Sequence, residues 1–329
     1  MRWPETHIMT QNGEQQAIAP LVISASRATD IPAFHAKWFM NRLREGYCLW
    51  ENPFNTKQQQ YISFEKCKAF VFWSKNPSPL MPFLSEIEAR GYQFYFQYTL
   101  NDYEQEGLEQ RLPKVSQRLA TFKKLAERIG KHRVIWRFDP IIISNTLTVD
   151  AVLKKIRRLT EAVMHCTEKF VFSYVCWYRK TEHALKNNDP SFRPPTQEEM
   201  HNLAAGIIAI NAELSTSLQI ATCAEAIDLE AFGIAKNRCV DDTLLLRLCP
   251  ENKEILHFCG IKKTQASLLP LADTALKDTG QRALCGCVPS KDIGSYNTCM
   301  HLCTYCYANQ SPKSVIRRMN TLNFMNEKL

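Results

Sequence analysis

The chain has 329 residues, 45% hydrophobic and 22% charged, a composition that excludes a largely disordered protein and allows a sizeable core. Its formal net charge of +8 is a mild excess, smaller than a dedicated nucleic-acid-binding protein would carry. No stretch reaches the ~18 apolar residues of a membrane span. The first residues also lack the apolar run of a secretory signal, so we expect a cytoplasmic protein without a membrane partner.

Short apolar runs alternate with amphipathic segments from residue 21 onwards. Most runs are rich in β-branched and aromatic residues, which is typical of buried strands. The predicted strands cover residues 21–26, 47–50, 69–74, 92–100, 133–143, 169–175 and 218–223. We expect residues 1–20 to be a short leader and residues 21–329 to be a single domain, because no flexible linker interrupts them.

Helices are predicted between these strands from their end signals. Ser78 followed by Pro79 is typical of a helix start. Thr196 and Glu199 have the spacing of a capping box at the head of another helix. Strand–helix alternation predicts a parallel sheet with right-handed crossovers, closed as a TIM-like β/α barrel or open as a doubly wound sheet. We favour the barrel.

Polar residues that follow the strands are candidates for a site, since a parallel barrel carries its active site at the carboxyl ends of its strands. Arg27, Asp30 and Arg137 are the main cavity candidates. Each also has a structural interpretation, because Asp30 can open a helix and Arg137 can pair with Asp139. Further candidates of this kind are Ser26, Lys75, Asn76 and Glu225.

Nine of the thirteen cysteines follow residue 222. An odd number excludes complete disulfide pairing in a monomer, and a reducing compartment favours metal binding or catalysis. Cys299, Cys303 and Cys306 have CxxxCxxC spacing, which can bind three irons of a [4Fe–4S] cluster and leave the fourth open. The alternative is structural zinc with His301 as a ligand, although we expect His301 to be a solvent-exposed loop residue.

Four more cysteines form a second candidate set. Cys223 ends a predicted strand, Cys239 follows it, and Cys285 and Cys287 flank Gly286. Four thiolates are the full complement of a second, closed [4Fe–4S] cluster, and Gly286 lets two near neighbours turn toward one metal. One structural zinc, or free thiols in packing, are the alternatives.

Five motifs follow one another along the chain: ISASRATDIPAFHAKWFMNRL (23–43), VFWSKNPSPL (71–80), RVIWRFDPI (133–141), QRALCGCVPSKDIGSYNTC (281–299) and CTYCYAN (303–309). In this order they resemble a bacterial family called domain of unknown function 1848, whose C-terminal cysteines are similar to the cluster loop of radical S-adenosylmethionine (SAM) enzymes.

The resemblance implies a [4Fe–4S] cluster on the CxxxCxxC motif whose open iron chelates SAM, with Tyr305 near the adenine. It also implies a 5′-deoxyadenosyl radical that abstracts hydrogen from the substrate, and reduced flavodoxin or ferredoxin as electron donor. Radical-SAM barrels carry this motif after their first strand. We therefore expect a permuted, radical-SAM-type barrel in which residues 292–296 replace that strand beside residues 21–26, with 223–310 as the cysteine-rich iron–sulfur segment.

Two rival functions stay open at this stage. The first is a zinc-stabilised nucleic-acid-binding protein, since residues 111–133 contain eight Lys or Arg and basic surfaces attract phosphates. The second is an iron–sulfur electron carrier or sensor that does not cleave SAM.

Overall fold

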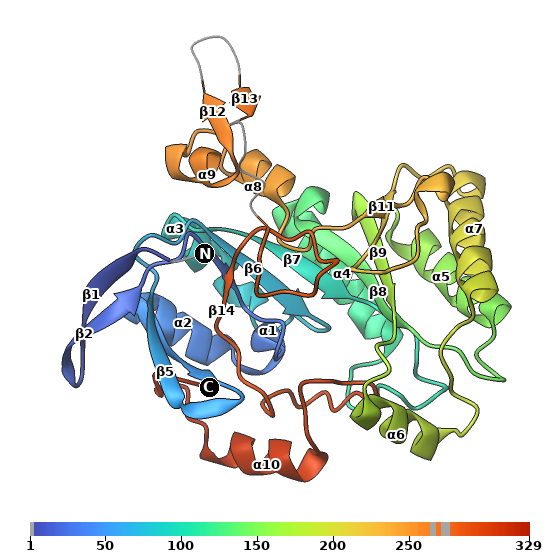
Figure 1. Cartoon of the computed structure of the whole chain (residues 1–329), viewed down its shortest axis with the longest axis horizontal. Helices are drawn as coiled ribbons and strands as arrows, with labels where there is room; N and C mark the ends of the chain where they lie inside the picture. The colour runs from blue at the N-terminus through green and yellow to red at the C-terminus, as the bar shows by residue number, and fades with distance from the viewer. Residues whose placement is uncertain (1–2, 264–267, 271–276) are drawn as a thin grey trace.

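The computed structural model describes residues 3–263, 268–270 and 277–329. Its centre is an eight-stranded sheet in the order β11-β10-β9-β8-β7-β6-β3-β14, in which every neighbouring pair is parallel (Figure 1). The strands are β3 (Val22–Ser24), β6 (Ala69–Ser74), β7 (Gln93–Thr99), β8 (Val134–Ile141), β9 (Lys169–Tyr174), β10 (Gln219–Thr222), β11 (Ala235–Lys236) and β14 (Lys291–Asp292). All the predicted strands except 47–50 are confirmed in this sheet.

The α/β class and the large parallel sheet are confirmed, but a closed TIM-like barrel is not shown. Within the described ranges, the hydrogen-bonded ladder begins at β11 and ends at β14, so the sheet is open. Both end strands are only two residues long, and each pairs with a single neighbour.

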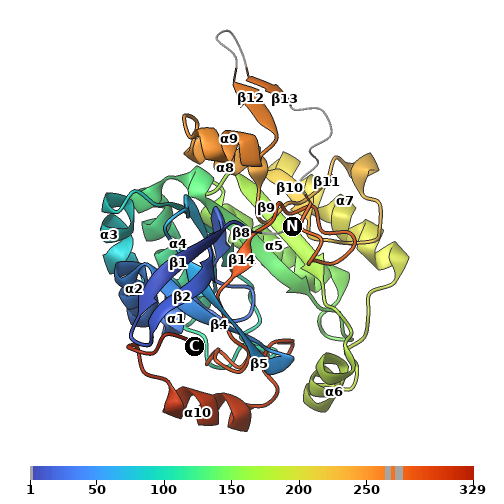
Figure 2. The ribbon, with the colours of Figure 1, turned by 60° about the vertical axis from the view of Figure 1, so that its left-hand side comes forward.

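A second sheet lies beside the first and has the order β1-β2-β5-β4. Its strands are β1 (Glu5–Thr10), β2 (Gly13–Ile18), β4 (Tyr47–Asn52) and β5 (Asn55–Ser63), and Figure 2 shows them toward the viewer. The expected leader thus forms the hairpin β1–β2, with Ala17, Ile18 and Ala19 buried. The strand predicted at 47–50 exists but lies outside the parallel sheet. Two residues connect it to β5, and so short a connection allows only antiparallel pairing.

Helices pack against the sheets through regularly spaced apolar residues. In α5, for example, Val152, Ile156, Leu159 and Val163 are all buried. The helices are α1 (Ile31–Phe34), α2 (Ala36–Glu45), α3 (Leu84–Ala89), α4 (Val115–Ile129), α5 (Val149–Val163), α6 (Arg179–Asn188), α7 (Gln197–Glu213), α8 (Asp242–Leu248), α9 (Lys253–Phe258) and α10 (Pro312–Thr321). Figures 1 and 2 place α8, α9 and the hairpin of β12 (Ile261–Lys263) with β13 (Leu268–Pro270) at the end of the molecule opposite α10.

One predicted helix start is confirmed by the structure and another is wrong. The Thr196–Glu199 capping box is confirmed, since each side chain accepts a hydrogen bond from the backbone amide of the other residue. The predicted start at Ser78 is wrong, because a 3₁₀ turn over Met81–Phe83 precedes α3. Pro82 lies in that turn and has no amide hydrogen to donate to a regular helical turn.

The position of β14 decides where the CxxxCxxC loop lies. Lys291 and Asp292 pair in parallel with Ile23 and Ser24, and the Ile293 amide donates a 3.1 Å hydrogen bond to the Ser24 carbonyl. The predicted position beside 21–26 is therefore confirmed, but the strand covers Lys291–Asp292, so only Asp292 of the predicted segment 292–296 belongs to it. The chain leaves this edge directly into the loop with the three cysteines.

Close packing after β14 gives a test of this arrangement. A Cβ atom on Gly294 would lie 2.6 Å from the Ser26 Cβ atom, too close for real atoms. We expect Gly294→Ala to lower the free energy of unfolding by about 1–3 kcal/mol in urea titrations, through overpacking. Adding Ser26→Gly should recover part of this loss, because it removes the clashing side chain. A single variant as stable as the exposed control Gly280→Ala would contradict the packing.

Candidate functional site

The three cysteines of the CxxxCxxC motif lie together on the loop after β14. Cys299, Cys303 and Cys306 are all partly exposed and unpaired. Burial raises the pKa of the Cys303 thiol to about 12, and the Lys75 ammonium partly opposes this rise. Burial also raises the pKa of Cys299, and the neighbouring Cys303 and Cys306 contribute to that shift. The three thiols are therefore close enough to interact electrostatically.

Long-range hydrogen bonds hold the backbone of this loop in place. His35 Nε2 donates to the Thr298 carbonyl at 2.9 Å, and Asn309 Nδ2 donates to the Cys299 carbonyl at 2.8 Å. The Thr304 amide donates to the Leu108 carbonyl at 3.0 Å. The loop is thus tied to the start of α2, to its own far end and to the segment after β7.

His301 is buried, with 2% of its surface exposed, so the prediction of a solvent-exposed residue is wrong. Its Nε2 atom donates to Asp30 Oδ2 at 2.8 Å, and its ring packs edge-on against Phe34 at 4.6 Å between centroids. The imidazole of His301 is buried because it is hydrogen-bonded to Asp30, which is distant in the sequence. Because Nε2 is used by Asp30, His301 anchors the loop to α1.

Asp30 is the centre of this anchor. Its Oδ1 accepts hydrogen bonds from the Ser74 hydroxyl at 2.7 Å and the Ala33 amide at 3.0 Å. Its Oδ2 accepts from the Lys75 amide at 2.7 Å as well as from His301. Asp30 therefore caps the start of α1, which confirms its structural interpretation. It also joins the end of β6 to the cysteine loop.

Replacing Asp30 tests this anchoring role. In Asp30→Asn, one acceptor oxygen becomes an amide donor that faces two existing donors. We expect the free energy of unfolding to fall by about 2–3 kcal/mol, since buried donors lose their acceptor. Urea titration measures the change, with Asp150→Asn at the exposed start of α5 as the control. Equal stability of the two variants would show that the contacts of Asp30 contribute nothing.

Tyr305 is buried within an ionic network. Its hydroxyl accepts from Lys75 Nζ at 2.8 Å and from Asn101 Nδ2 at 3.1 Å, and it donates to Glu109. Glu109 also pairs with Lys75 at 2.9 Å and with Arg118 at 3.3 Å. Burial opposes the charge of Glu109, but the two cations outweigh it and lower its pKa to about 2.

Sequence reasoning missed part of this network. Lys75 was among the residues expected after a strand, but Glu109, Arg118 and Asn101 were not identified. Glu109 lies in a polar connection between β7 and α4 that has no motif or periodicity. Only its burial, at 3% exposed, reveals its role.

The second cysteine set also comes together, at the carboxyl ends of β10 and β11 and just before β14. The Sγ atoms of Cys223 and Cys239 are 3.4 Å apart. The Cys287 sulfur accepts from the amide of Cys239 at 3.2 Å. The thiol of Cys285 lies beside Cys287, whose hydrogen bond lowers the pKa of Cys285 to about 7.

Two of the predicted cavity residues lie beside this second set. Arg137 donates to the Cys239 sulfur at 3.0 Å and is also paired with Asp139, so its structural interpretation is confirmed. Burial disfavours the charge of Arg27, but Asp292, Cys287 and Cys239 outweigh that effect and raise its pKa. Asp30 lies at the CxxxCxxC loop and Arg137 at the second set, whereas Arg27 contacts both, since its carbonyl accepts a 2.6 Å hydrogen bond from the Tyr307 hydroxyl.

The model of the family described as Domain of unknown function (DUF1848) matches residues 22–308. This chain belongs to the DUF1848 family. No curated protein and no solved structure matches.

The DUF1848 match includes both cysteine sets and all of the parallel sheet, but ends before α10. Over the described ranges, no group of three or more His, Cys, Asp or Glu side chains is already arranged to hold a metal ion. Over the same ranges, no helix is long and apolar enough to cross a membrane.

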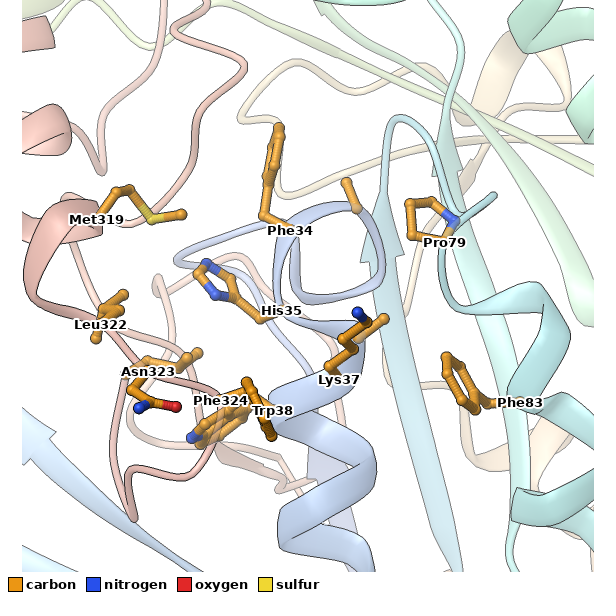
Figure 3. A pocket seen from close by; sticks show the side chains of 13 residues that line it. Phe34, His35, Lys37, Trp38, Pro79, Phe83, Met319, Leu322, Asn323 and Phe324 are labelled. Carbon is orange, nitrogen blue, oxygen red and sulfur yellow. The ribbon is translucent and has the colours of Figure 1, made fainter.

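A pocket of about 320 Å³ lies away from the cysteines, between the start of α2 and the C-terminal segment. Figure 3 shows Phe34, His35 and Trp38 on one side of it and Met319 and Leu322 on the other. Five of its thirteen lining residues therefore lie outside the DUF1848 match. His35 lines the pocket and is also hydrogen-bonded to the carbonyl of Thr298, at the start of the cysteine loop.

Proposed function

We propose that this chain is a radical-SAM-type iron–sulfur enzyme, with a [4Fe–4S] cluster on Cys299, Cys303 and Cys306. One observation carries the proposal: the CxxxCxxC loop leaves a strand that pairs in parallel with β3, at the carboxyl edge of a parallel sheet. The open sheet is then a permuted partial barrel, in which β14 takes the spatial place of a first strand.

The residues present fit such a cluster. Three thiols with the required spacing interact electrostatically and are partly exposed. Two cations lie close to them, because the Lys75 ammonium interacts with Cys303 and the Lys180 ammonium interacts with Cys306. Such cations offset the negative charge of three thiolates.

A reduced cluster of this kind, with SAM on its open iron, supplies a 5′-deoxyadenosyl radical that abstracts hydrogen from a substrate. The chain's own residues hold the loop and its surroundings in position. Lys180 Nζ donates to the Tyr307 carbonyl at 2.7 Å and to the Asn309 carbonyl at 2.6 Å, which fixes the end of the loop. Lys75 and Glu109 fix the hydroxyl of Tyr305, the proposed neighbour of the adenine.

The experiment is to measure iron, sulfide and zinc in protein purified without oxygen, and to record the electron paramagnetic resonance spectrum of the reduced protein with and without SAM. We expect about four irons with matching sulfide on the loop, and a spectrum that changes when SAM is added. Zinc without iron would favour the nucleic-acid-binding rival. An iron–sulfur spectrum indifferent to SAM would favour a carrier or sensor. In the proposed enzyme, reduced flavodoxin or ferredoxin supplies the electron.

A further inference from the structure

We propose that Cys223, Cys239, Cys285 and Cys287 form a closed four-thiolate site for a single tetrahedral metal ion, of which zinc is the best match. This site is separate from the CxxxCxxC loop and does not depend on the proposed SAM chemistry. It would fasten the ends of β10 and β11 to the segment that leads into β14.

The spacing of the sulfurs favours one ion over a cluster. A tetrahedral zinc site with Zn–S bonds of about 2.3 Å holds its sulfurs about 3.8 Å apart. The sulfurs of Cys223 and Cys239 are 3.4 Å apart, whereas ligands on different irons of a cluster are more widely separated.

Hydrogen-bond donors converge on these sulfurs as they do on metal-bound thiolates. Cys239 Sγ accepts from Arg137 at 3.0 Å and from Asn237 Nδ2 at 3.2 Å. Cys287 Sγ accepts from the backbone amides of Cys239 and Val240 at 3.2 and 3.3 Å. Two strong donors on each of two buried sulfurs exceed what neutral thiols in packing need, whereas such donors typically orient metal ligands.

The surrounding charges agree with a thiolate site. Four thiolates on one divalent ion leave a net charge of −2, which needs compensation in a buried place. Arg137 is 3% exposed and bonded to Cys239, Arg27 interacts with Cys287, and Arg282 at the rim interacts with Cys223. Arg137 also pairs with Asp139 and Arg27 also interacts with Asp292, so carboxylates share these cations with the thiols.

The four sulfurs are neighbours in a row, Cys223–Cys239–Cys287–Cys285, and do not yet surround one point. Binding therefore requires side-chain rotation that closes the row on the ion. The ligands come from two stretches of chain separated by α8 and α9. A shared ion would join them and so set the start of β14, which explains why the pairing of such a short strand with β3 would be maintained.

The test uses the full chain with Cys299→Ala, Cys303→Ala and Cys306→Ala combined, so that iron on the loop does not interfere. Zinc, iron and sulfide are measured after anaerobic purification and gel filtration. We expect about one zinc per chain, and its loss when Cys239→Ala is added. Cys249→Ala, which removes a buried thiol from the same apolar cluster, should keep the zinc. Because Cys239→Ala can also disturb packing, Cys285→Ala at the partly exposed end of the row should lose zinc to a chelator at least tenfold faster.

Replacing zinc with cobalt gives a second readout, because four thiolates on Co²⁺ give intense charge-transfer absorption that Cys285→Ala should weaken. Several results would overturn the proposal. The first two are the absence of zinc, and zinc that persists in both Cys239→Ala and Cys285→Ala. The other two are about four irons with sulfide in the variant without the three loop cysteines, and a Cys223–Cys239 disulfide detected by mass spectrometry. The iron result would indicate a second cluster. None of these results tests the proposed cluster on the CxxxCxxC loop, because the variant lacks the three loop cysteines.

Discussion

Cys303→Ala is expected to abolish both the loop cluster and the formation of 5′-deoxyadenosine, down to the level of a protein-free control. Cys303 is the middle ligand of the CxxxCxxC motif, and its loss leaves only two thiols, which cannot hold a cluster with one open iron. The substitution removes a single sulfur atom, so it creates only a small cavity. We therefore expect the free energy of unfolding of the metal-free protein to change by less than about 1 kcal/mol.

Cys166→Ala is the matched control, because Cys166 is also partly exposed and unpaired but lies away from the loop, just after α5. It should keep iron, the response to SAM and full cleavage. If Cys303→Ala retained the iron of the loop and still responded to SAM, the assignment of these three cysteines would be wrong.

Glu109→Gln is expected to have the largest effect on stability. The Glu109 carboxylate is buried between Lys75 and Arg118, and Arg118 is 1% exposed. A neutral amide at this position leaves the buried Arg118 and the partly buried Lys75 without their anion, which costs about 3–5 kcal/mol. Urea titration measures the loss, and Glu127→Gln on the exposed face of α4 is the control. A loss no greater than that of the control would contradict this account of the network.

The same carboxylate makes a specific contribution to the pH dependence of stability. The pKa of Glu109 is lowered from 4.5 to about 2, so its charge stabilises the folded state fully above pH 4.5. This contribution is lost as the pH falls from 4.5 to about 2. The native chain should therefore lose more stability than Glu109→Gln over that interval, and parallel acid titrations of the two proteins would disprove the lowered pKa.

Burial on both faces explains why most of the parallel strands could be predicted from the sequence. In β6, Phe70 and Phe72 face one apolar cluster while Ala69 and Val71 face the other, which gives a continuous apolar run. The open form of the sheet could not be predicted in this way. It depends on the pairing of β11 and β14, which are two residues long and carry no periodicity.

The candidate site could be predicted where its residues are close in sequence or follow a strand. Cysteine spacing and strand ends pointed to both cysteine sets, and the structure brings each set together. The buried polar contacts could not be found in this way. His301 and Asp30 are 271 residues apart, and Tyr305 and Glu109 are 196 residues apart, so only the fold shows that they meet.

Cleavage of SAM is the most direct test of the proposed function. The chain, reconstituted with iron and sulfide without oxygen and then reduced, would be incubated with SAM, and the products separated by chromatography. The account predicts 5′-deoxyadenosine that requires reductant, SAM and the three loop cysteines. A fully reconstituted and reduced sample that forms no 5′-deoxyadenosine, or forms it equally well in Cys303→Ala, would contradict the account.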